Sequence, residues 1–328
     1  MLLPPCLALI TSGCHPSGAL TVAEASTSLI STCARNDTMA SVRIPTASKS
    51  VGSITTAVAM GQASRMGSSA GNVAHGATPV GFPAWGGLIM AREHPVAVIT
   101  GAARGIGAAT AARLAARGFT VALIDLPLES PGRHGEIPGP YRPAHGQDLD
   151  EAAAACNGRG HAHAADVRDP EALARVIDTV VAHHGSIDVV VAAAGAVAGG
   201  APLWETDDDT WRTMIDINLT GVFNLARAAL PAMLDAPSPR NGRFVAVASA
   251  AAHHGLPQLA AYSAAKHGVA GLVKALSAEL ADSGVTANAV CPGSTATGML
   301  DASAAIYGMA DRSEFADQAR IGRLIDPD

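Results

Sequence analysis

The chain has 328 residues, a formal net charge of −6 at pH 7 and only 3% aromatic residues. Its lysines and arginines are scattered and do not alternate with aromatic residues, so neither nucleic acid nor a membrane surface is expected as a partner. The pairs His183–His184 and His253–His254 lack a third ligand at the spacing of a zinc site, so no metal is expected.

Residues 1–89 have the composition of a segment that does not fold alone. Ser, Thr, Ala and Gly dominate, and no helical or strand period is sustained. Such a segment buries too little apolar area to offset the entropy of ordering it. The apolar run Met1–Ile10 lacks a basic start, so secretion is not expected. We expect a disordered leader or a mis-assigned start near Met90, followed by one cytoplasmic α/β domain over residues 90–328.

A strand, a glycine-rich turn and a helix open this domain. The apolar run Val96–Ile99 leads into Thr100–Gly107, and a stretch of helical composition follows from Ala108. Glycines at 101, 105 and 107 let the backbone approach a pyrophosphate, and the helix N-terminus stabilises its charge. The context predicts a dinucleotide site, whereas a tight turn without a ligand is the simpler alternative.

A carboxylate ends the second predicted strand, Thr120–Ile124. Asp125 lies where an acid is expected to accept hydrogen bonds from the adenosine ribose, and it would repel a 2′-phosphate. This favours NAD over NADP. Arg104 argues mildly for NADP, but an exposed arginine can turn to solvent.

A long insertion follows Asp125. Residues 126–146 are rich in Pro, Gly and Arg, and a helix is predicted over Asp148–Cys156. One interpretation is a tolerated surface insertion. The other is a flap over the adenosine end of the cofactor.

Three side chains with acid–base chemistry come later. Ser249 follows the apolar strand Phe244–Ala248, and Tyr262 and Lys266 lie four residues apart on a predicted helix. Helical spacing places an ammonium beside a phenol, which favours the deprotonated phenol.

With these motifs in order, the chain from about His94 onwards resembles the short-chain dehydrogenase/reductase family. The resemblance implies a single Rossmann-type, doubly wound parallel sheet with helices on both faces. It implies a catalytic group of Asn218, Ser249, Tyr262 and Lys266, in which Asn218 serves a proton relay and Tyr262 transfers the proton. The residues that it implies in NAD binding are Gly101, Arg104, Gly105, Ile106, Gly107, Asp125, Asp166, Val167, Ala193, Gly195, Tyr262, Lys266, Pro292, Gly293, Thr295 and Thr297.

Two features depart from the family pattern. The segment Ala192–Gly195 replaces the family's Asn-Asn-Ala-Gly, which puts local hydrogen bonding in doubt. The chain also stops soon after Gly322–Leu324, where the family continues into one more helix and strand. We therefore expect a domain truncated beside the strand Val285–Val290.

The insertion and the segments Pro202–Asp208 and Gly293–Asp301 are similar to the mycofactocin-coupled branch of the family. This implies NAD held so tightly that mycofactocin, a peptide-derived redox cofactor, re-oxidises it in place. The family also implies a homo-oligomer, a dimer or tetramer. Residues 299–320 are expected to form an apolar lid, which suggests an apolar alcohol or ketone as substrate. A non-catalytic NAD sensor and an inactive truncated enzyme are the alternatives.

Overall fold

The structure is a computed structural model, and it describes residues 94–126, 137–319 and 321–328. The leader, residues 1–89, and part of the insertion lie outside the described residues. Within them, a parallel sheet has the strand order β3-β2-β1-β4-β5-β6. Its strands are β1 (Val96–Thr100), β2 (Thr120–Asp125), β3 (Gly160–Ala164), β4 (Val189–Ala192), β5 (Arg243–Val247) and β6 (Thr286–Val290).

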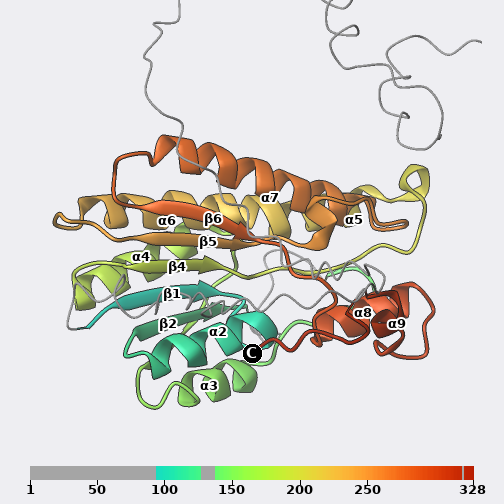
Figure 1. Ribbon diagram of the computed structural model, residues 1–328, viewed down its shortest axis with the longest axis horizontal. Helices are drawn as coiled ribbons and strands as arrows, with labels where there is room; N and C mark the ends of the chain where they lie inside the picture. The colour runs from blue at the N-terminus through green and yellow to red at the C-terminus, as the bar shows by residue number, and fades with distance from the viewer. Residues whose placement is uncertain (1–93, 127–136, 320) are drawn as a thin grey trace, which may run out of the picture. The chain divides into compact units, whose positions relative to one another are not determined.

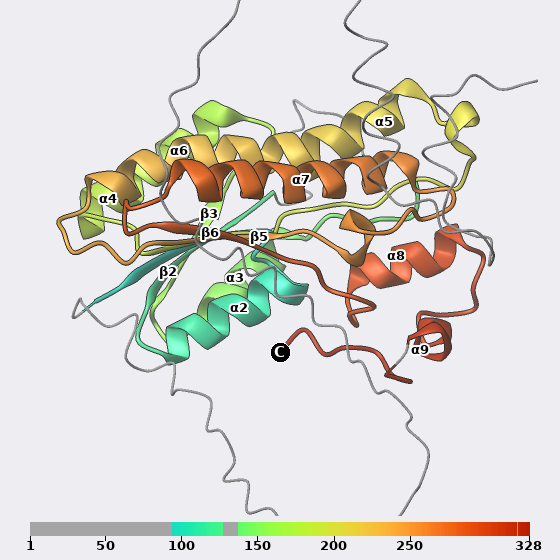
Figure 2. The ribbon, with the colours of Figure 1, turned by 45° about the horizontal axis from the view of Figure 1, so that its top comes forward.

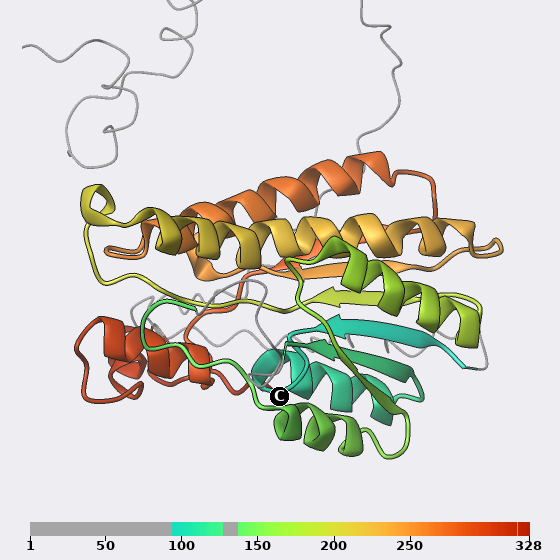
Figure 3. The ribbon, with the colours of Figure 1, turned by 180° about the vertical axis from the view of Figure 1, so that it is seen from behind.

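Helices cover both faces of the sheet, as Figures 1 and 3 show. One face carries α2 (Gly105–Ala116) and α3 (Gly146–Ala154). The other carries α4 (Pro170–His184), α6 (Gly221–Asp235) and α7 (Ala260–Glu279). The prediction of a doubly wound parallel sheet is confirmed.

The position of β1 inside the sheet explains why its sequence is apolar at every residue and does not alternate with polar residues. All five of its residues are buried. Val96 and Val98 pack in the core beneath α4 and α6, whereas Ala97 and Ile99 pack in the core beneath α2. A strand covered on both faces needs apolar side chains at every position.

The chain winds one way from β1 to β3 and the other way from β4 to β6. The carboxyl ends of β1 and β4 therefore lie side by side where the winding reverses. In sheets of this type, ligands bind beyond the strand ends at that point.

Helix α3 begins two residues earlier than predicted. The Asp148 carboxylate accepts a hydrogen bond from the backbone N–H of His145 at 2.7 Å, in a capping box that starts the helix at Gly146. The predicted strands agree with β1, β2, β5 and β6 to within one residue at each end.

A long helical run lies between α4 and α7 on one face of the sheet (Figure 2). It begins as α5 (Asp208–Ile215), passes through a π-helical turn at Asp216–Thr220 and continues as α6. By length and mean hydropathy of 1.2, Asp208–Asp235 could cross a membrane, but half of the window is buried inside the fold. A core helix meets the same criteria.

The predicted lid contains two short helices after β6. They are α8 (Gly298–Ile306) and α9 (Glu314–Gln318). Beyond them the chain returns to the loop after β6, where Thr295 forms a parallel bridge with Ile325. The backbone N–H of Ile325 donates to the Ser294 oxygen at 2.8 Å, and that of Ala296 donates to the Ile325 oxygen at 2.9 Å.

Candidate active site

Tyr262 and Lys266 lie one turn apart on α7 and face the ends of the strands. Both are buried, with 6% and 3% of their surface exposed. The Lys266 ammonium lies 5.7 Å from the centre of the Tyr262 ring and donates to the carbonyl oxygen of Val247 at 3.0 Å. Ser249 follows β5, and its hydroxyl oxygen accepts from the Ala251 N–H at 3.1 Å. The structure thus brings the three predicted side chains together.

The electrostatics differ from the sequence expectation. Burial raises the pKa of Tyr262, and a hydrogen bond with Ser249 opposes that shift. Burial also lowers the pKa of Lys266 from 10.5 to about 8. The expectation that Lys266 lowers the pKa of the phenol is not met, because desolvation outweighs the other influences on Tyr262.

Asn218 lies in the π-helical turn and is fully buried. Its amide donates to the carbonyl oxygens of Ala196 and Met214, both at 3.0 Å, and accepts from the Ala196 N–H at 3.2 Å. A side-chain carbon built on Gly195 would lie 2.9 Å from the Asn218 oxygen and 3.6 Å from the Lys266 nitrogen. Asn218, Gly195 and Lys266 therefore meet behind the site.

The glycine-rich turn packs directly on the turn after β4. Gly101 has a φ of +67°, and a side-chain carbon there would lie 2.6 Å from the Ala194 backbone. At Gly107 such a carbon would lie 2.0 Å from the Gly101 carbonyl oxygen. The backbone N–H groups of Ala193 and Ala194 donate to Thr100, at 3.2 and 3.4 Å. The backbone of Ala193, which stands at the family's second asparagine position, and of Ala194 thus still ties the two turns together.

Asp125 is fixed at the end of β2 beside that turn. One carboxylate oxygen accepts from the Ala103 N–H at 2.9 Å and the other from the Leu126 N–H at 2.8 Å. Burial raises the pKa of Asp125, and these two hydrogen bonds oppose the shift. The carboxylate therefore has a defined position facing the cavity.

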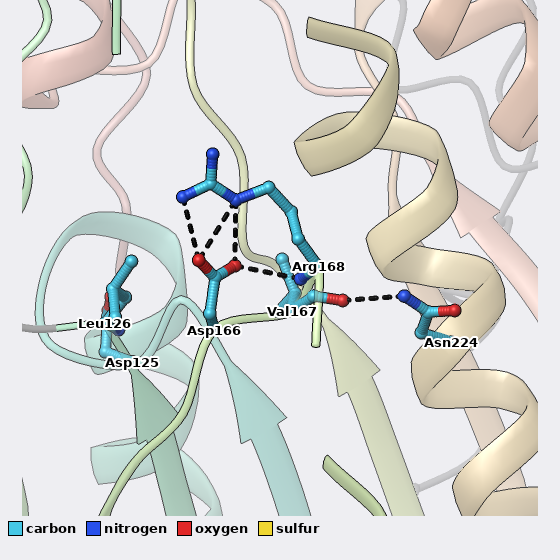
Figure 4. Close-up of polar contacts among 6 residues, drawn as sticks. All are labelled: Asp125, Leu126, Asp166, Val167, Arg168 and Asn224. Carbon is cyan, nitrogen blue, oxygen red and sulfur yellow. Dashed lines mark hydrogen bonds and ion pairs between the residues drawn. The ribbon is translucent and has the colours of Figure 1, made fainter. Parts of the chain in front are cut away.

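Asp166 is engaged by a residue that the sequence did not indicate (Figure 4). Arg168 donates from Nη2 at 2.7 Å and from Nε at 3.0 Å, and both carboxylate oxygens of Asp166 accept. The Val167 carbonyl accepts from the Asn224 amide at 3.0 Å, which ties this loop to α6. In the sequence, only the spacing of two residues between Asp166 and Arg168 could have indicated this ion pair.

Arg104 contacts the described end of the insertion. Its guanidinium lies 5.6 Å from the centre of the Tyr141 ring and donates to the carbonyl oxygen of Arg142. Tyr141 also packs on the apolar cluster that contains Tyr262. The described end of the insertion is therefore tied to the glycine-rich turn, although residues 127–136 of the predicted flap lie outside the described residues.

These elements enclose a cavity of about 830 Å³. Asn218 lies behind its wall. Every other predicted site residue lines the cavity: Gly101, Arg104, Gly105, Ile106, Gly107, Asp125, Asp166, Val167, Ala193, Gly195, Ser249, Tyr262, Lys266, Pro292, Gly293, Thr295 and Thr297.

Histidines gather at the outer edge of β3, away from this cavity. The rings of His161 and His184 have centres 6.0 Å apart, and those of His183 and His184 are 6.3 Å apart. In the part of the chain that the structure describes, no three His, Cys, Asp or Glu side chains are grouped so that they could hold a metal ion.

Comparison with known proteins agrees with this geometry. The model of the short chain dehydrogenase family matches residues 95–133 and 141–307. The chain is 40% identical over 215 residues to (-)-trans-carveol dehydrogenase of Rhodococcus erythropolis, covering 64% of this chain and 75% of that protein. It is 38% identical over 238 residues to cis-4-hydroxycyclohexanecarboxylate dehydrogenase of Sinomonas cyclohexanicum, covering 71% and 84%.

Among solved structures, carveol dehydrogenase of Mycobacterium avium in complex with NAD is similar, with a TM-score of 0.58 and 37% identity. That match covers 63% of this chain and 73% of the other. The chain belongs to the short-chain dehydrogenase family, and it is an oxidoreductase.

Replacing Lys266 with Met is expected to raise the melting temperature at pH 7. A buried lysine whose pKa in the fold is about 8, against 10.5 ordinarily, destabilises the fold wherever it is protonated. That cost is fully present below pH 8 and is relieved as the pH rises towards 10.5. The gain in melting temperature should therefore shrink between pH 8 and pH 10.5. Each kcal/mol of stability corresponds to roughly 2–4 °C in a domain of this size.

Thermal unfolding at several pH values between 7 and 10 measures this. Lys274→Met on the exposed side of α7 is the matched control and should change little. A Lys266→Met variant less stable than the parent at pH 7 would show that the bond to Val247 outweighs the cost of burial.

Proposed function

We propose that the protein is an NAD-dependent oxidoreductase that interconverts an apolar secondary alcohol and a ketone, or a primary alcohol and an aldehyde. The observation that carries the proposal is the group of Ser249 with the buried Tyr262 and Lys266, which lines the same cavity as Asp125. The dehydrogenases of carveol and of a hydroxycyclohexane acid among its relatives support an alcohol substrate.

The residues of the cavity fit NAD. The close approach at Gly101 and Gly107 leaves no side chain between the turn and a pyrophosphate, which the N-terminus of α2 would stabilise. Asp125 would accept hydrogen bonds from the adenosine ribose, and Asp166 with Val167 would contact the adenine; all three line the cavity. When bound, NAD supplies a nicotinamide ring that takes up two electrons and a hydrogen from the alcohol carbon. The loop of Pro292, Gly293, Thr295 and Thr297 would hold that ring.

The protein's own groups handle the proton. The raised pKa of Tyr262 keeps its phenol protonated, as a donor to a ketone oxygen requires. In the oxidation direction Tyr262 would accept the alcohol proton, and the Lys266 ammonium, 5.7 Å from the centre of its ring, would counter only part of the burial that raises the pKa of the phenol. Ser249 fixes the substrate oxygen, and Lys266 would also hold the nicotinamide ribose. Asn218 lies beside Lys266, where it would support a proton path to solvent.

Tyr262→Phe is expected to abolish turnover while NAD binding persists, because the phenol transfers a proton and adds little to dinucleotide affinity. Loss of such a group costs about 10²–10⁴-fold in kcat. Alcohol oxidation and NAD binding are measured on the same preparation. Turnover within threefold of the parent would reject the assignment of Tyr262 as the proton-transfer residue, whereas a parent that binds NAD but oxidises no alcohol would favour a non-catalytic NAD-binding protein.

Cofactor choice is expected to follow Asp125. Asp125→Ser should improve the kcat/KM for NADP relative to NAD, because the variant loses a carboxylate that repels a 2′-phosphate. The ratio of the two kcat/KM values is the measurement. A parent protein that already prefers NADP would contradict the placement of Asp125 at the ribose.

We also propose the mycofactocin-coupled branch, with NAD retained between turnovers and mycofactocin as the external electron acceptor. The contact of Arg104 with Tyr141 and with the Arg142 carbonyl supports it, because it fastens the insertion over the adenosine end of the cavity. Cofactor release would require this contact to open, which makes it a slow conformational step.

Arg104→Ala is expected to accelerate NAD release, by roughly tenfold if the contact is worth about 1.4 kcal/mol. The NAD remaining on the protein after timed desalting measures the rate. Arg113→Ala, at an arginine of α2 that does not line the cavity, is the control. Equal retention of NAD by both variants would show that the contact between Arg104 and the insertion does not control cofactor release.

The remaining expectations stay proposals. We propose a cytoplasmic homo-oligomer, and the exposed aromatic side chains of Trp211 and Phe223 on the α5–α6 run support an interface there.

We further propose that residues 90–328 form the catalytic domain and that residues 1–89 are dispensable, which the low apolar periodicity of the leader supports.

A further inference from the structure

The hydroxyl of the proposed catalytic tyrosine has an unusual partner. Tyr262 donates to the sulfur of Met299 at a distance of 3.8 Å. Met299 is the second residue of α8, and the Ser303 hydroxyl donates to its backbone carbonyl at 2.9 Å. The first turn of the lid is thereby fixed above the reacting hydroxyl.

The Met299 side chain extends from α8 across the catalytic end of the cavity. Its terminal methyl would lie 3.5 Å from a side-chain carbon built on Gly195, at the point that Lys266 and Asn218 also approach. On its way it packs on a small apolar cluster of Val197, Ala251, Leu259, Tyr262 and Ala302. Met299 thus fills the space between the phenol and the turn after β4.

A thioether is suited to a position that a substrate must share. A buried hydroxyl needs a hydrogen-bond acceptor, and a thioether sulfur can serve as a weak one. Breaking such a weak hydrogen bond costs little free energy. A carbonyl or alcohol oxygen accepts more strongly and therefore takes over the hydroxyl. The unbranched methionine side chain can move aside through its rotatable bonds.

We propose that Met299 is a specificity-determining residue, which occupies the place beside the Tyr262 hydroxyl and limits the bulk that a substrate can carry at its reacting carbon. The inference rests on the proposed function. The substrate class that it selects is an apolar secondary alcohol with at least one slender substituent at the carbinol carbon. The apolar residues Ala251 and Leu259 line the same part of the cavity and favour a hydrocarbon group as the other substituent.

Met299→Ala tests the size limit. The substrates are 2-propanol and 2,4-dimethyl-3-pentanol, which is branched on both sides of the carbinol carbon. The variant should raise kcat/KM for the branched alcohol relative to 2-propanol at least tenfold, since each methylene of space is worth about 10–200-fold in discrimination. Met299→Leu conserves the volume and should keep the ratio within about twofold of the parent.

Met233→Leu provides a control away from the cavity, because it makes the methionine-to-leucine exchange of Met299→Leu at a buried core methionine of α6. It should leave the ratio unchanged. A ratio for Met299→Ala within threefold of the parent would overturn the proposal.

A second measurement needs no turnover. With methionine methyl groups labelled by ¹³C, Met299→Leu assigns the Met299 signal. That signal should move in Tyr262→Phe while the Met233 signal stays in place. If the parent oxidises neither alcohol, the proposed function falls, and the methyl signal alone decides whether Met299 contacts Tyr262. An unmoved Met299 signal would overturn the inference even in an active enzyme.

Discussion

The contact between two backbone turns is the constraint on which the site depends. The turn after β1 approaches the turn after β4 so closely that a side-chain carbon on Gly101 would lie 2.6 Å from Ala194. Hydrogen bonds from Ala193 and Ala194 to Thr100 hold the approach. This contact joins the half of the sheet that carries Asp125 to the half that leads into Ser249 and Tyr262. One continuous cavity can therefore serve both a dinucleotide and a substrate.

Behind that contact, the burial of Lys266, the proposed catalytic lysine, destabilises the fold. Lys266 is almost fully buried, and its pKa is lowered to about 8 by desolvation. The Lys266 ammonium donates a hydrogen bond to the carbonyl oxygen of Val247. Nearby, the π-helical turn in the α5–α6 run directs Asn218 inwards to the backbone of Ala196. Irregular helical turns of this kind are frequent at functional sites. The fold thus keeps a lysine and an irregular turn where stability alone would not favour them.

The sequence predicted the parts of the site that depend on local spacing. Gly101, Asp125 and Ser249 follow apolar strands, and Tyr262 and Lys266 share a helix face, so strand ends and helical periodicity were enough to place them. The contacts of Arg104 with Arg142 and of Tyr262 with Met299 join residues 38 and 37 apart, and no local pattern indicates them. The raised pKa of Tyr262 was also missed, because the balance of burial against charge depends on positions in space.

The parallel bridge between Thr295 and Ile325 closes the chain on itself at the base of the lid. The chain therefore leaves this loop after Ala296 and returns to it at Ile325, which is hydrogen-bonded to Ser294 and to Ala296. Changes within such a closed excursion leave the strand register and the glycine-rich turn undisturbed. Substitutions in the proposed lid can accordingly alter the substrate end of the cavity without displacing the glycine-rich turn or the strands that position it.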